Sequence, residues 1–155
     1  MVNYLPETLT AEWLDKNGVA PSEIYHFTRA FPQGMRLTRE HAEKALREKL
    51  DLVYIFETIL RFGDKEEFSV KTAEAQERKE QAEKRIQRAF QDANLDAQKI
   101  RNTASRPLEP LPPSLETAYR SAMARDEVAQ VNALFEAEQT FNEAITDAVM
   151  EAIAK

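Results

Sequence analysis

Apolar positions in the first 63 residues recur at intervals of three and four, with turn-forming residues between the groups. The groups are Ile24, Phe27 and Phe31; Ala42, Ala45, Leu46 and Leu50; and Val53, Phe56, Ile59 and Leu60. Such spacing places each group on one face of an α-helix. Glycine and proline residues, such as Gly18, Pro32 and Gly63, favour turns between them. Residues 1–63 are therefore predicted to form a small module of short helices.

Residues that favour helix starts precede these groups. Thr8 or Thr10 is predicted to begin a first helix, and Thr38 and Asp51 to begin two later ones. Side chains of this kind accept hydrogen bonds from the free backbone N–H groups of a first turn. The run Leu52–Phe56 is also rich in strand-forming residues, but helical spacing continues after it, so a helix is favoured over a strand.

A long helix is predicted next, because the chain contains no Pro and no Gly from Lys65 to Asn102. Asp64 is predicted to cap its start. The apolar positions of this segment are mostly alanines that repeat every three and four residues. Such a seam is too thin to hold the helix alone, so a partner helix is expected against it.

The partner is predicted downstream, after a Pro-rich corner at residues 106–113. The large apolar side chains of this last segment form one amphipathic stripe: Val128, Val131, Leu134, Phe135, Phe141, Ile145, Val149 and Ile153. A break near Arg125-Asp126 is compatible with the pattern. The two long segments are expected to pack as an antiparallel hairpin, with Ile86 buried near Phe141 or Leu134.

The predicted fold class is therefore all-α, with an N-terminal module of short helices at residues 1–63 and a long antiparallel helical hairpin at residues 64–155. No run is long and apolar enough to span a membrane. No secretion signal is recognisable near residue 1 and the chain contains no Cys, so a cytoplasmic protein is predicted.

Residue types that build enzyme active sites are sparse. The two histidines are His26 and His41, and Glu23-x-x-His26 is only half of a paired di-metal motif. The three glycines lie too far apart for a phosphate-binding loop. The sequence therefore predicts that the protein is not an enzyme and that it holds no cofactor and no metal.

The charge is distributed unevenly. The net charge is −6, and residues 106–155 contain four basic and nine acidic residues, a net −5. The basic cluster around Arg78-Lys79 and Lys84-Arg85 is interleaved with glutamates, so nucleic acid is not predicted as a partner. A partner-binding face is predicted at four acidic residues with helical spacing: Glu136, Glu143, Asp147 and Glu151. An ordinary solvated face has the same pattern, and this alternative stays open.

One stretch of the N-terminal module has a further significance. Trp13-Leu14, Phe27, Phe31-Pro32-x-Gly34, Leu37-Thr38, Ala42 and Leu50-Asp51-Leu52 follow one another over residues 11–62. This series resembles a module in small helical accessory proteins of lambda-like phages and prophages. Where that module often has an aromatic-Leu-Ala sequence, this chain has Tyr54-Ile55-Phe56. The resemblance implies a phage or prophage setting, in which small proteins bind host machinery, including defence systems.

The predicted function is thus that of a non-enzymatic phage or prophage accessory protein that binds and modulates a host protein, with inhibition of a host defence system as one form. The partner is expected to be a host or phage protein, and the location the host cytoplasm. The alternative is a structural or assembly protein, in which the long helices form a homo-oligomeric bundle. Small residues in the seam suit this alternative because they let helices approach closely.

Overall fold

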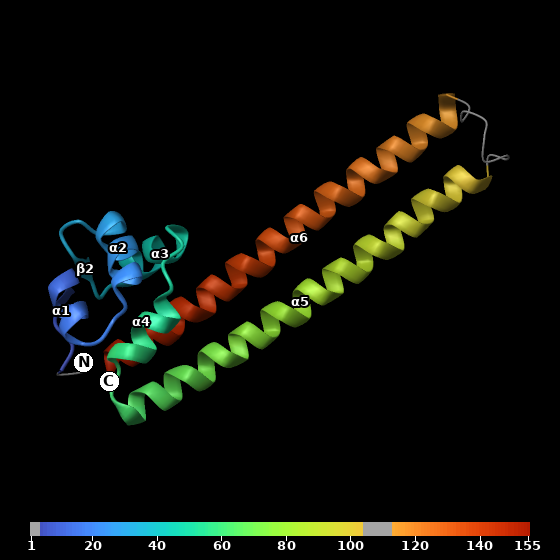
Figure 1. The fold of residues 1–155 in the computed structure, drawn as a ribbon. Coiled ribbons are helices and arrows are strands. Elements are labelled where there is room, and N and C mark those ends of the chain that lie inside the picture. Colours follow the sequence, from blue (N-terminus) through green and yellow to red (C-terminus); the bar gives the residue numbers. More distant parts are fainter. Residues whose placement is uncertain (1–3, 104–112) are drawn as a thin grey trace. The chain divides into compact units, whose positions relative to one another are not determined.

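The computed structural model describes residues 4–103 and 113–155, which are almost entirely helical (Figure 1). The helices are α1 Ala11–Lys16, α2 Pro21–Ala30, α3 Arg39–Arg47, α4 Leu52–Ile59, α5 Phe62–Thr103 and α6 Pro113–Ala154. The strands are β1 Thr8–Leu9 and β2 Met35–Arg36. The predicted all-α fold with a helical hairpin is confirmed. The Pro-rich corner predicted at 106–113 lies, apart from Pro113, outside the described residues.

The chain forms two compact units. Unit 1 consists of the described residues of Met1–Glu77 together with Thr140–Lys155, and unit 2 is Arg78–Gln139. This division differs from the predicted segments 1–63 and 64–155. The physical reason is that α5 and α6 each contribute buried side chains, such as Phe68 and Ile145, to the core that the first sixty residues begin.

The short helices of unit 1 begin where the sequence predicts. Thr10 Oγ1 accepts a hydrogen bond from the Trp13 N–H at 3.2 Å, so Thr10 rather than Thr8 caps α1. Thr38 caps α3 in the same way, and Asp51 Oδ1 caps α4 with a 3.0 Å bond from the Tyr54 N–H. Helix α4 over Leu52–Ile59 confirms the helix that was favoured over a strand.

A two-stranded ribbon was missed from the sequence. Strands β1 and β2 pair antiparallel, with Thr8 opposite Arg36 and Leu9 opposite Met35. Each strand has two residues, which is too short to show the alternation that identifies a strand. Gly34 precedes β2 with φ +91°, and a Cβ there would lie 2.8 Å from both Leu9 O and Thr8 Cγ2. Gly34 therefore serves two purposes, a left-handed turn and a close approach of two backbones.

The core of unit 1 joins the short helices to the two ends of the hairpin. Its fully buried large side chains include Phe27, Leu52, Ile55, Phe56, Phe68, Ile145 and Val149. The rings of Phe56 on α4 and Phe68 on α5 lie with centroids 5.7 Å apart. Aromatic side chains bury large areas and contribute strongly to such a core, so α4 is the element that connects the N-terminal module to α5.

The junction between α4 and α5 corrects one prediction. Helix α5 begins at Phe62, so Gly63 lies in its first turn and Asp64 does not cap it. The Lys65 N–H instead donates to the Arg61 carbonyl at 2.8 Å. Asp64 Oδ2 accepts a 2.8 Å hydrogen bond from the Tyr4 hydroxyl, and this hydroxyl accepts one from the Arg61 N–H at 3.0 Å. Asp64 thus fixes Tyr4 at the junction.

Unit 2 consists of the remaining parts of α5 and α6, and among its described side chains none is fully buried. Helix α6 continues through Arg125 and Asp126 without the break that was considered. A cavity of about 230 Å³ lies between the two helices, lined mainly by Ile86, Ala89, Phe90, Ala93, Ala129 and Ala133. The contact is therefore thin, as the alanine seam predicted.

Two details of the hairpin were wrong. Ile86 is half-buried rather than buried, and its cavity is shared with Ala129 and Ala133 rather than with Leu134 or Phe141. The large apolar residues Val128, Val131 and Phe135 do not pack on α5 but are exposed. The alanine-bearing face of α6 is turned toward α5 instead, because alanines on both helices allow the close approach that larger side chains prevent.

We expect Gly34→Ala to lower the free energy of unfolding by about 1–3 kcal/mol, because the new methyl group meets backbone and the left-handed φ strains any L side chain. Gly63→Ala is the matched control, since nothing lies within 4 Å of its added Cβ. That substitution should leave stability unchanged or raise it by up to about 1 kcal/mol. Urea unfolding of the two variants checks the contrast, and equal effects would contradict it.

A second prediction concerns pH. Burial, supported by the carboxylate of Asp64, raises the pKa of Tyr4 above its ordinary value of 10.0. The folded protein therefore holds this proton more tightly than the unfolded chain, and the associated stability is present below pH 10 and is lost as pH rises through the folded pKa. Tyr4→Phe should destabilise by about 0.5–1.5 kcal/mol at pH 8. Urea unfolding at pH 8 and 11 should show that this difference narrows at the higher pH.

Candidate protein-binding site

An exposed apolar row lies on α6 within unit 2. Val128, Val131 and Phe135 are 59%, 65% and 61% exposed, although each is a large apolar side chain. Their spacing of three and four residues places them on one helix face. The eight residues Val128–Phe135 contain no charged side chain, in a protein that is 31% charged. We call Val128, Val131 and Phe135 the apolar row.

The apolar row faces away from α5. Asp126, Ala129, Gln130 and Ala133 line the cavity that α6 shares with α5. At about 100° per residue, the row falls on the opposite side of α6 from these four. Leu134, at 39% exposed, lies at the border between the two faces. Helix α6 in unit 2 thus has a small-residue face toward α5 and a large-residue face toward solvent.

The heptad positions of the apolar row are buried where α6 passes through unit 1. Steps of seven residues from Val128 and Val131 lead to Val149 and to Ile145. Ile145 and Val149 are both 0% exposed, within the core of unit 1. The heptad positions that hold buried core residues in the unit 1 part of α6 therefore hold exposed apolar residues in its unit 2 part. This pattern is typical of a helix face that a further protein surface covers.

The predicted acidic face is divided between the units and partly occupied. Glu136 belongs to unit 2, whereas Glu143, Asp147 and Glu151 belong to unit 1. Asp147 Oδ1 accepts a 2.5 Å hydrogen bond from Arg39 Nη2 on α3. Glu151 forms an ion pair with Lys71 on α5, so α3 and α5 supply cations to the end of α6.

These ion pairs have a structural role. The hydrogen bond that Arg39 donates to Asp147, more than any other interaction, raises the pKa of the Arg39 guanidinium further above its already high value, so Arg39 stays charged at any physiological pH. Lys71 also pairs with Glu67 at 3.1 Å, and Lys155 pairs with the same glutamate. Each exposed pair contributes little to stability by itself. Together they hold the last turns of α6 to their neighbours and reduce the uncompensated negative charge of this face.

The histidines have local structural contacts. His41 Nδ1 accepts a 2.8 Å hydrogen bond from the Arg36 N–H, and its ring lies 5.3 Å from that of Phe31. His26 is exposed beside Tyr25. Glu23, the other half of the considered metal motif, accepts a bond from the Asp51 N–H. No group of three or more potential metal ligands occurs in the part of the chain that the structure describes.

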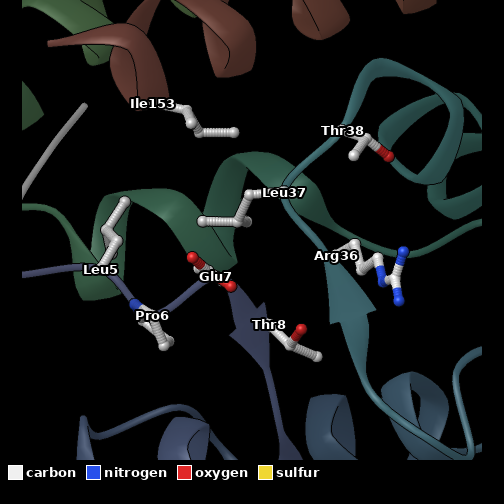
Figure 2. Close-up of a pocket in the computed structure, with 8 residues that line it drawn as sticks. All are labelled: Leu5, Pro6, Glu7, Thr8, Arg36, Leu37, Thr38 and Ile153. Atoms are coloured by element: carbon white, nitrogen blue, oxygen red, sulfur yellow. The ribbon is translucent and has the colours of Figure 1, made fainter.

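A cavity of about 410 Å³ lies beside the two-stranded ribbon in unit 1 (Figure 2). Leu5, Leu37 and Ile153 form apolar walls, and Glu7 and Arg36 bring one charge of each sign. Figure 2 shows the Arg36 guanidinium directed away from the Glu7 carboxylate. A second cavity of similar volume opens beside Phe141. In the second cavity the Ser69 hydroxyl donates a 3.0 Å hydrogen bond to the Glu57 carboxylate.

Comparison with protein-family models, with curated proteins and with solved structures found no match. Among the residues that the structure describes, no helix has the length and apolar character needed to cross a membrane. The apolar row is therefore the feature on which an assignment of function depends. The sequence did not predict this row as a site, because Val128, Val131 and Phe135 were assigned to the hairpin contact. The absence of charge in the eight residues Val128–Phe135 was a usable signal.

The ion pair of Arg39 and Asp147 gives a third prediction. Because both side chains are about half exposed, Arg39→Gln or Asp147→Asn should each lower the melting temperature only slightly. The effect should shrink in 1 M NaCl, where surface charges are screened. Thermal unfolding at two salt concentrations is the measurement. A large loss of stability that salt does not reduce, in either variant, would show that the pair does more than join two exposed surfaces.

Proposed function

We propose that this protein is a non-enzymatic interaction protein that binds another protein chain through the apolar row on α6 of unit 2. The observation that carries this proposal is the exposure of Val128, Val131 and Phe135 on one helix face. Single exposed apolar residues are common on protein surfaces, but a contiguous row marks an interaction site.

The energetics support the same function. Full burial of a Val or Phe side chain contributes about 1.5–3 kcal/mol, and each side chain of the row is close to two-thirds exposed. A partner that covers the row therefore gains several kcal/mol before the entropic cost of association. The described part of unit 2 has no fully buried side chain, so an additional surface would also complete its packing.

The kind of partner follows from the resemblance of residues 11–62 to accessory proteins of lambda-like phages. In that setting the target is a host or phage protein, and binding modulates it, for example by inhibiting a host defence system. The acidic residues of α6 contribute to the rate of encounter with a basic target, because complementary charge steers association more than it raises affinity. Glu143, which lies near Arg39 but is exposed, is the best placed for this among the unit 1 residues.

A homo-oligomeric assembly protein is the second candidate. It is favoured by one specific feature, namely that the pattern of the apolar row is complementary to itself when two copies of α6 run antiparallel. Host binding and self-association use the same row, so they are alternative states of any one copy of the chain.

A photo-crosslinking amino acid in place of Val131 tests the function in bacterial cells. We expect it to capture a discrete protein species, because this position lies in the middle of the row. The same amino acid in place of Val70, which is 58% exposed but lies in unit 1, is the matched control and should capture nothing discrete. Phe135→Asp should abolish the capture at Val131. If Val131 captures no more than Val70 does, the row is not a binding surface.

A further inference from the structure

We infer that the occupant of the apolar row, in the absence of a target, is a second copy of this chain, with the two α6 helices antiparallel about a twofold axis. The inference rests on the proposed function, since it takes the row to be a binding surface. It goes further by naming the partner and the register, and it is carried by the sizes and charges of residues along one face of α6.

Side-chain size is complementary in one antiparallel register. When Val128 of one copy lies opposite Val131 of the other, Ala124 lies opposite Phe135, and the twofold axis repeats both pairs. The large ring of Phe135 then meets the small side chain of Ala124, which is exposed on the same face. Alternation of large and small side chains is what allows facing helices to interdigitate. A parallel pair would place Phe135 against Phe135 and Ala124 against Ala124.

The charges beside the row favour the same orientation. Arg120 and Glu138 lie on one flank of the row, and the antiparallel register brings Arg120 of one copy next to Glu138 of the other. Arg120 already pairs with Glu116 at 2.8 Å, but both side chains are exposed and such pairs exchange readily. A parallel pair would instead bring Arg120 beside Arg125 of the second copy, and like charges at these positions oppose pairing.

The extent of the surface sets the expected strength. Contact between Arg120 and Glu138 covers about 27 Å of helix and only three large apolar side chains from each copy. Interfaces of this size belong to the small, reversible class, so a weak dimer whose population rises with protein concentration is expected. A protein target competes with the second copy for the row, so self-association covers the row until a target is present.

Sedimentation velocity of the full chain from about 1 to 200 µM tests the stoichiometry. We expect a reversible shift from monomer to dimer. Val131→Asp and Phe135→Asp should each weaken dimerisation at least tenfold, because a carboxylate would lose its water in the interface. Val70→Asp is the control and should leave the shift unchanged. Circular dichroism melts confirm that the variants fold, as expected for exposed positions.

Cysteine pairing tests the orientation, and the absence of any native Cys makes the result unambiguous. Ser121 lies one heptad before Val128, Gln139 lies beside the row, and the antiparallel register brings these two positions to within about one residue of facing each other. A mixture of Ser121→Cys and Gln139→Cys proteins should form the mixed disulfide much faster than either protein forms a disulfide with itself. Preferential self-pairing of each variant would establish a parallel dimer and overturn the inference.

The outcomes separate the inference from the function on which it rests. A chain that stays monomeric at 200 µM, or a dimer that Val131→Asp does not weaken, overturns the inference. If the crosslinker at Val131 then captures a different protein in cells, the proposed function stands without a second copy. If it captures nothing and no dimer forms, both are overturned.

Discussion

The structure depends on the burial of the last turns of α6 in a core that the first sixty residues begin. Ile145 and Val149 are fully buried together with Phe56 of α4 and Phe68 of α5. These side chains come from segments up to about ninety residues apart, so closing the core carries a loop-closure cost that local contacts do not. The ion pairs of Arg39 with Asp147 and of Lys71 with Glu151 reinforce the same closure at the surface.

This arrangement explains why unit 1 has fully buried side chains and the described part of unit 2 has none. In unit 1 the large face of α6 is covered, so the alanines of α5 need supply only part of the packing. In unit 2 the two helices contact each other through small residues, around a cavity next to Ala89 and Ala133. Two helices with so little buried surface gain most of their stability because α5 and α6 each continue as one helix into unit 1.

The local signals in the sequence were sufficient for most of the fold. Thr10, Thr38 and Asp51 cap helices as expected, and the absence of Pro and Gly after residue 64 corresponds to one long helix. The features of the fold that were predicted wrongly or missed are those that tertiary contacts decide. Strands β1 and β2 are too short to recognise, and α5 begins before Asp64 because that carboxylate binds the Tyr4 hydroxyl instead. The apolar row was not predicted as a site for a related reason, since periodicity shows that a helix has an apolar face but not which of two faces a neighbour covers.

Under the proposed function, the apolar row and the charged residues of α6 contribute to binding in different ways. Asp147 and Glu151 are engaged with Arg39 and Lys71, and recruiting them to a partner would break one exposed pair to make another, with little net gain. The row loses no existing interaction when it is covered, so its burial contributes to affinity directly. The negative charge of the last fifty residues acts at longer range and is screened by salt. Affinity should therefore follow the row, and the rate of association should follow the charge.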